Sequence, residues 1–407
     1  MPSTPIDRAV LGYTLGNRDF RLLWGDSIFN GVGMSGEQVV LSLLVYQVTG
    51  SSVWVGVVLA VYFVPSLLVG ALAGAIADWM DRRQLVRRCE LAIAVALGLF
   101  GIALSFGLLQ LEVLLLMAFV SGVLRALYSP ARLSYAYDLV GPARAVGGLS
   151  MLNIGFRVGQ FAGALTAGVL VQHVGVDAAY WSFAVAHAVA YLLVLRLRSS
   201  GVASELDTMP LRENLRTLAV EMRTNRNLLT VMLVMVSVGI FGFSYITLLP
   251  ELATVQLGVG AQELGFMHAA RAAGGLTGVV VLAMLGASRR RGLLLIATIA
   301  MFGVGLVLLG LSATFVVVLA ALVVTAATSA VYDVLTQSVM QVIVPNKLRG
   351  RAMGIWVLVV GIEPVGHILV GASALLLGVS LALQINGAIL LLIVMVVLRS
   401  SPRLRSL

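Results

Sequence analysis

The feature that most constrains this chain is a succession of apolar stretches of about 20 residues, the length of helix that crosses a bilayer. Hydrophobic residues make up 60% of its 407 positions, and charged residues only 11%. A soluble core of this size cannot bury that much apolar surface. The sequence therefore predicts an all-α polytopic membrane protein.

Breaks between the apolar stretches predict twelve membrane helices. They are expected at residues 20–47, 52–77, 86–109, 112–137, 146–172, 178–197, 227–250, 262–286, 292–312, 314–340, 349–376 and 379–398. Lys and Arg gather in the two termini and the even-numbered connections, and the odd-numbered connections have none. By the positive-inside rule both termini are expected in the cytoplasm, on a bacterial inner membrane, with no removable signal peptide.

Internal similarity divides the chain into two halves. Three markers recur at nearly one offset: "NRDFRLL" at Asn17 and "NRNLLTV" at Asn225, Arg82-Arg83 and Arg289-Arg290, and "RAVGG" at Arg144 and "RAMGI" at Arg351. They predict two six-helix bundles, residues 1–198 and 227–407, in parallel repeat. The charged linker 199–226 has apolar residues at helical spacing, which predicts an amphipathic surface helix or an ordinary linker helix.

Polar residues inside membrane helices should lie on the face away from lipid. The first, fourth and tenth expected helices each have such a stripe, and the seventh has a fainter one. The stripes include Asp26, Asn30 and Glu37; Ser121, Arg125, Tyr128 and Arg132; and Thr325, Ser329, Tyr332 and Thr336, with Asp333 beside them. These helices are expected to line a watery space, whereas the third, ninth and twelfth are expected to face lipid.

The fifth expected helix has two distinct faces. Its polar face carries Asn153, Arg157 and Gln160, and its small-residue face carries Gly155, Gly159 and Gly163. The first face is suited to solute and the second to close approach by another helix. Further candidates are Arg271 with His268 in the eighth helix and Glu363 with His367 in the eleventh; His187 is expected away from the cavity.

Arg125 is expected near mid-membrane, where its permanent charge requires a carboxylate, carbonyl groups or water. Glu37 and Asp26 are the acids of the first helix. The balance between desolvation and the attraction of an arginine sets the proton affinity of such a carboxyl group. Glu37, Asp26, Asp333 and Glu363 are therefore candidate proton carriers, although a static ion pair between helices is an open alternative.

The stretch "GAIADWMDRR" resembles the loop between the second and third helices of the major facilitator superfamily. Gly74, Asp78, Arg82 and Arg83 match its pattern, with Asp81 in place of the usual glycine. "LVYQVTGSS", "SPAR" and "VPNKLRGRAMG" look like the bacterial branch that contains enterobactin exporters and macrolide-efflux proteins. The resemblance implies a charged latch at the cytoplasmic edge and the superfamily fold.

The fifth helix also resembles the superfamily's antiporter motif, which Gly159, Gly163 and Gly168 match, while Ala164 stands at the usual proline. This partial match favours export by antiport.

Phosphate-binding and enzyme motifs are not recognised, so no cofactor, no metal and no nucleic acid is expected. The sequence predicts a monomeric transporter that exchanges protons for an amphipathic drug or siderophore-like molecule. A lipid or lysolipid flippase, an uncoupled facilitator and a non-transporting sensor are the alternatives.

Overall fold

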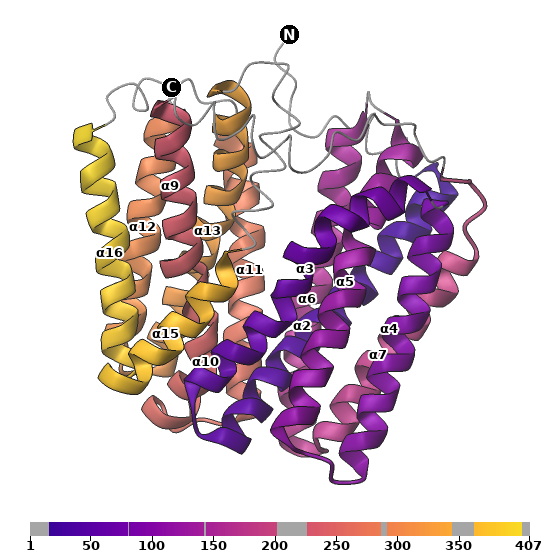
Figure 1. The fold of residues 1–407 in the computed structure, drawn as a ribbon, viewed down its shortest axis with the longest axis horizontal. Coiled ribbons are helices and arrows are strands. Elements are labelled where there is room, and N and C mark those ends of the chain that lie inside the picture. The colour runs from indigo at the N-terminus through magenta and orange to yellow at the C-terminus, as the bar shows by residue number, and fades with distance from the viewer. Residues whose placement is uncertain are drawn as a thin grey trace. The chain divides into compact units, whose positions relative to one another are not determined.

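The computed structural model describes residues 16–79, 81–141, 144–201, 226–285, 291–343 and 362–400. Long helices make up nearly all of this part of the chain (Figure 1). Those of the first half are α2 (Arg18–Thr49), α3 (Ser52–Trp79), α4 (Arg82–Ser105), α5 (Leu111–Val140), α6 (Ala145–His173) and α7 (Val176–Leu195). Those of the second half are α9 (Arg226–Phe241), α11 (Ala261–Leu285), α12 (Arg291–Leu311), α13 (Phe315–Ile343), α15 (Glu363–Leu377) and α16 (Val379–Ser400).

Ten helical segments among the described residues are long and apolar enough to cross a membrane. Two shorter apolar helical segments, Ser52–Leu67 and Glu363–Leu377, complete the set. The expected all-helical membrane fold with twelve helices is therefore confirmed. The expected start of the eleventh helix and the linker helix at 202–225 lie outside the described residues.

The seventh helix continues beyond α9 in an irregular form. After Gly242 it passes through the 3₁₀ helix η2 (Phe243–Leu248), the single turn α10 (Leu249–Glu251) and the π turn η3 (Leu252–Gln256). Pro250 lies within this segment and has no backbone N–H to donate. A run of regular α-helix is thus replaced by three short turns of different pitch.

Contacts between Cα atoms group the chain into two compact units. Unit 1 contains residues 1–50, 64–207 and 259–272, and unit 2 contains 51–63, 208–258 and 273–407. The first part of α3 thus belongs to unit 2 and the first part of α11 to unit 1. Pro65, which removes one helical hydrogen bond, lies beside the point where α3 changes unit. The predicted bundles 1–198 and 227–407 and their linker remain a prediction. The two compact units are not continuous in sequence, since α3 and α11 each contribute residues to both.

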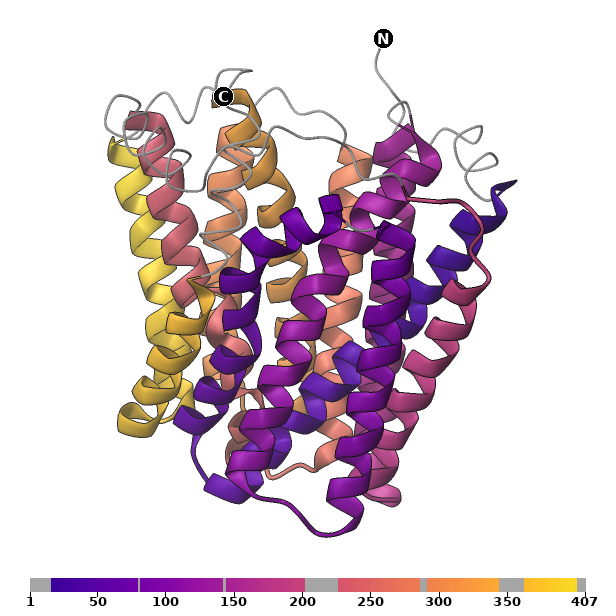
Figure 2. The same cartoon turned by 45° about the vertical axis from the view of Figure 1, so that its right-hand side comes forward.

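Glycines bring α2 and α6 into backbone contact within unit 1. A Cβ atom at Gly159 would overlap the carbonyl oxygen of Ile28, and one at Gly163 would overlap that of Val32. Helix α2 runs obliquely among its neighbours in both Figure 1 and Figure 2, so it crosses α6 at this small-residue face. The face predicted for close helix approach is used for that purpose, and its partner is α2.

Candidate functional site

Buried polar side chains from four helices meet in the interior of unit 1. We call this group the ionic network. It consists of Asp26, Asn30 and Glu37 of α2, Glu90 of α4, Ser121, Arg125, Tyr128 and Arg132 of α5, and His187 of α7. Each is less than a tenth exposed. Charges and polar groups are costly in such surroundings unless they pair with one another.

Glu37 and Arg125 form the ion pair of this network. An Arg125 guanidinium nitrogen lies 2.7 Å from Glu37 Oε2, and the Ser121 hydroxyl donates to Oε1. Both oxygens of Glu37 therefore accept hydrogen bonds, and its side chain has no solvent exposure. The structure brings together the arginine and the acid that the sequence analysis proposed as partners.

Asp26 and Asn30 connect α2 to two other helices. The Tyr128 hydroxyl donates to Asp26 Oδ2 at 2.7 Å, and the Asn30 amide donates to Glu90 Oε1 at 2.8 Å. The Glu90 carboxyl group also interacts with the side chains of Asp26 and Tyr128. The polar stripes of the first and fourth expected helices thus meet around Glu90, an acid on α4.

Glu90 and His187 are network members that the sequence analysis missed. His187 Nδ1 lies 2.7 Å from Glu90 Oε2, and both side chains are fully buried. His187 is expected away from the cavity, and the structure places it inside the ionic network, because α7 packs its buried face against α2 and α4. The available signal was Glu90 itself, an acid within an apolar stretch, which membrane helices carry only where it is used or paired.

The third expected helix, α4, is predicted to face lipid, and only one of its faces is exposed. Leu91, Val95 and Leu99 are exposed along one face. Glu90 lies on another face, next to α2 and α7. One side of α4 is therefore suited to lipid and the other supplies an acid to the interior.

Arg132 has a different environment from Arg125. Its guanidinium carbon lies 5.0 Å from the ring centroid of Phe156 and 5.6 Å from that of Tyr128, which is cation–π geometry. It also interacts electrostatically with Asp26. Arg132 was named in the sequence only as part of a stripe, and the structure places it at the edge of the ionic network.

Unit 1 contains further candidates outside this network, Arg157, Gln160 and Arg271. Arg157 and Gln160 on α6 are half-buried. Arg271, in the part of α11 that belongs to unit 1, lies 3.0 Å from His268 Nδ1. Gly168 packs on the same helix, where its added Cβ would lie 2.8 Å from the carbonyl oxygen of Ala261. The three glycines of the antiporter-like motif thus contact two different helices.

Unit 2 contains the other candidates of the second half. Asp333 on α13 and Glu363 in the first turn of α15 interact electrostatically, and Tyr332 packs at a tilt against Phe243. His367 accepts or donates a hydrogen bond at 2.8 Å to Thr247 and stacks on Phe63. Among the described residues of either unit, no cluster of His, Cys, Asp and Glu could hold a metal ion.

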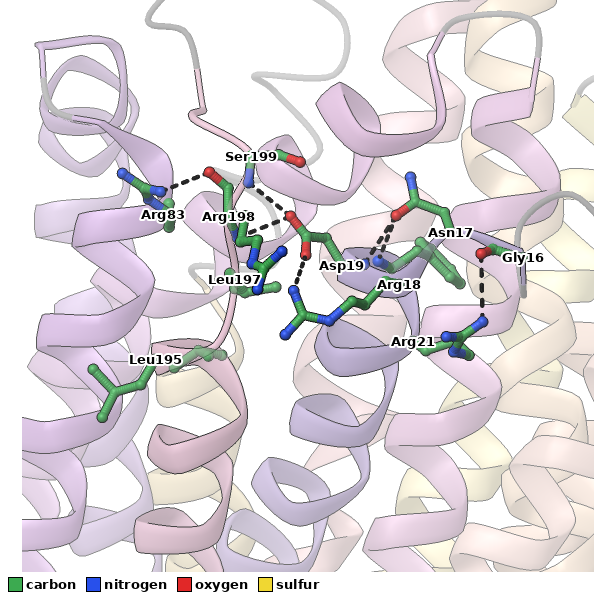
Figure 3. Close-up of polar contacts among 12 residues, drawn as sticks. Gly16, Asn17, Arg18, Asp19, Arg21, Arg83, Leu195, Leu197, Arg198 and Ser199 are labelled. Atoms are coloured by element: carbon green, nitrogen blue, oxygen red, sulfur yellow. Dashed lines mark hydrogen bonds and ion pairs between the residues drawn. The ribbon is translucent and has the colours of Figure 1, made fainter.

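A second polar cluster, which we call the end cluster, lies where α2 begins and α7 ends (Figure 3). Asp19 accepts the backbone N–H groups of Arg198 and Ser199 at 3.0 and 2.7 Å. Arg83 donates to the carbonyl oxygen of Arg198. These contacts fix the first residues after α7 to the ends of α2 and α4.

The superfamily-type loop supplies part of this end cluster. One guanidinium nitrogen of Arg82 donates to both carboxylate oxygens of Asp138 on α5, and Asp81 caps the N-terminus of α4. Both arginines of the motif therefore bind groups within unit 1. Gly74 and Asp78 lie on α3, but their side chains, and with them the implied latch, are outside the described part of the structure.

Solved structures with this fold are transporters. The nucleoside transporter NupG superposes with a TM-score of 0.76 at 12% identity, covering 93% of this chain and 98% of that one. A bacterial homologue of the human lysosomal transporter Spinster, in an inward-facing and occupied conformation, has a TM-score of 0.68 at 15% identity, covering 95% and 97%. At these identities the likeness concerns the fold.

The chain is a multi-pass membrane transporter of the major facilitator type, and not an enzyme. It belongs to the family described as transmembrane secretion effectors, whose model matches residues 13–406. It is 25% identical over 364 residues to the staphyloferrin A transporter of Staphylococcus aureus (strain NCTC 8325 / PS 47), covering 88% of this chain and 90% of that protein. The resemblance found in the sequence is thereby confirmed.

Proposed function

We propose that the protein is a secondary active transporter that exports an amphipathic small molecule, of drug or siderophore type, in exchange for protons. The family description as a secretion effector supports export. Similarity to a staphyloferrin A transporter supports a metabolite of that kind as cargo. The proposed location is the bacterial inner membrane, with both termini in the cytoplasm and a monomer as the working unit.

The buried Glu37–Arg125 pair is the observation that carries the proposal. A buried ion pair contributes little to stability relative to apolar residues, so its presence at the centre of a helical unit favours a functional role. Protonation of Glu37 removes the negative partner and leaves Arg125 to find another anion or water. The two charge states therefore favour different arrangements of α2 and α5.

Alternating access follows if these two charge states differ in affinity for the inward-open and outward-open forms. We assign proton binding first to Glu37, with Asp26, Asp333 and Glu363 as further proton sites. Contact with the cargo is assigned to side chains of several helices: Asn30, Arg125, Tyr128, Arg157, Gln160, Arg271 and Tyr332. The two six-helix halves are proposed to rock around these groups.

Inverted membrane vesicles provide the test. A pH-sensitive dye reports proton movement while lipophilic cations, macrolides, catecholate siderophores and staphyloferrin A are added in turn. Native protein is expected to couple movement of at least one of these compounds to protons, and Glu37→Gln is expected to abolish that coupling. Glu112→Gln is the matched control, because Glu112 is an exposed acid in the first turn of α5.

Transport of a panel compound without proton movement, unchanged in Glu37→Gln, would exclude antiport. The protein would then be an uncoupled facilitator. Movement of a fluorescent lysolipid between leaflets, with no response to the other compounds, would identify a flippase.

A further inference from the structure

Charge balance in the ionic network points to a bound proton. Three carboxyl groups, those of Asp26, Glu37 and Glu90, share the interior with the guanidinium groups of Arg125 and Arg132. With an uncharged imidazole at His187, full ionisation leaves one negative charge in excess. An unbalanced charge is costly in a buried site, and a single added proton removes it.

While the Glu37–Arg125 pair is closed, as in this structure, its hydrogen bonds disfavour Glu37 as the residence of that proton. Its Oε2 faces an Arg125 nitrogen and its Oε1 faces the Ser121 hydroxyl. Both neighbours donate, and donated hydrogen bonds favour the ionised form of a carboxyl group. Glu37 is thus satisfied as a carboxylate in this arrangement.

Asp26 and Glu90, unlike Glu37, each have a carboxyl oxygen that can carry a proton in this arrangement. Asp26 Oδ1 is buried without a hydrogen-bond partner, while its Oδ2 accepts from Tyr128. Glu90 Oε1 accepts from Asn30, and its Oε2 faces His187 Nδ1, an atom that can donate or accept. The two carboxyl groups interact electrostatically, so the charge of one affects the protonation of the other.

We propose that Asp26 and Glu90 form a proton-binding pair distinct from the Glu37–Arg125 ion pair, with His187 as the residue that positions Glu90. When Glu90 is ionised, His187 donates from Nδ1. When Glu90 is protonated, its Oε2–H donates to Nδ1 and the ring carries its proton on Nε2, so the change adds one proton overall. Neither state requires movement of the ring.

The surrounding titratable and charged groups come from four helices. They are Asp26 and Glu37 of α2, Cys89 beside Glu90 on α4, Arg125, Tyr128 and Arg132 of α5, and His187 of α7. Gly33 of α2 provides the room for the imidazole, since a Cβ atom there would overlap the ring. A role of the Asp26–Glu90 pair in coupling protons to transport depends on the proposed function. Proton binding by the pair does not depend on it.

Infrared difference spectroscopy of the purified full-length protein tests proton binding without transport. Spectra at two pH values, with ¹³C label in the side-chain carboxyl groups of glutamate or of aspartate, separate the two residue types. We expect a buried protonated-carboxyl band that is lost in the double variant Glu90→Gln/Asp26→Asn. The band should be unchanged in Glu112→Gln.

The conservative variant Glu90→Asp keeps the test informative if the amide variants do not fold. Part of the band should then move from the glutamate-labelled to the aspartate-labelled spectrum, and His187→Asn should shift it. A band that is indifferent to all substitutions at Glu90 and Asp26 overturns the proposal. If such an indifferent band is found and transport is still coupled to protons, the antiport proposal holds and the Asp26–Glu90 proposal fails. If the band depends on Glu90 but transport is not coupled to protons, the Asp26–Glu90 proposal holds and the antiport proposal fails.

Discussion

Units 1 and 2 bury different kinds of polar contact. Unit 1 has ion pairs in its interior and at its end, such as Glu37–Arg125 and Arg82–Asp138. In the described interior of unit 2 we find hydroxyl contacts, the two acids Asp333 and Glu363, and rings, with Phe302 in edge contact with both Phe243 and Tyr245. Ionic contacts respond to protonation, and aromatic and hydroxyl contacts do not. Among the described residues, the arginine–carboxylate pairs Glu37–Arg125 and Arg82–Asp138 belong to unit 1, whereas unit 2 contributes acids that interact with each other.

Among the substitutions that test this difference between the units, Glu37→Gln should cause the largest loss of stability. Glu37→Gln leaves Arg125 buried opposite a neutral amide, and loss of one partner of a buried pair costs ~3–5 kcal/mol of stability. The thermal midpoint of the detergent-solubilised protein should fall steeply. The double variant Glu37→Gln/Arg125→Met should recover much of that loss, because no charge is then left unpaired. A midpoint near that of the native protein in the single variant would contradict the ionic account of unit 1.

Gly159→Ala tests whether close backbone contact, rather than charge, holds α2 against α6. The added Cβ overlaps the carbonyl group of Ile28, and overpacking of this kind costs ~1–3 kcal/mol. Gly98→Ala on α4 is the matched control, since its Cβ would lie 3.8 Å from Trp181, an ordinary contact. Urea or heat titration of both variants should show a loss only for Gly159. Equal midpoints would show that α6 can shift away from α2 without cost.

Asp19→Ala tests the end cluster of unit 1. The substitution removes a charged acceptor from two backbone N–H groups, and loss of such a bond costs ~1–3 kcal/mol. Hydrogen exchange at Arg198 and Ser199 should accelerate, while amides in the middle of α7 keep their protection. Glu112→Ala, at an exposed site of α5, should leave both amides unchanged. Exchange that is no faster in Asp19→Ala would show that other contacts fix this segment.

Thr247→Val should produce the smallest effect and concerns unit 2. It replaces the hydroxyl that contacts His367 with a methyl group of similar size, at a cost of ~1 kcal/mol. Thr277→Val on α11 is the control, because Thr277 is bonded only to its own helix at an exposed position. The thermal midpoint of Thr247→Val should fall slightly, and that of Thr277→Val should match the native protein. If Thr247→Val lowered the thermal midpoint as much as Glu37→Gln, the proposed difference between the two units would be wrong.

The sequence predicted the number of helices because bilayer thickness acts on each apolar stretch separately. Polar spacing along α2 and α5 likewise predicted which faces carry Asp26, Glu37 and Arg125, since helical periodicity is a local property. The small-residue face of α6 was predicted for the same reason. Glu90 and His187 could not be paired in this way, because neither belongs to a repeated polar stripe that would orient it on its helix.

Sequence alone therefore determined that this chain is an all-helical membrane transporter of the major facilitator type, with buried acids and arginines on particular helix faces. Tertiary structure decided which of these groups meet, that Glu90 and His187 join them, and that α3 and α11 each divide between two compact units. The physical reason is the distance along the chain over which each interaction acts. Hydrophobic length and periodicity act within one helix, whereas hydrogen bonds and charge pairing depend on how separate helices cross.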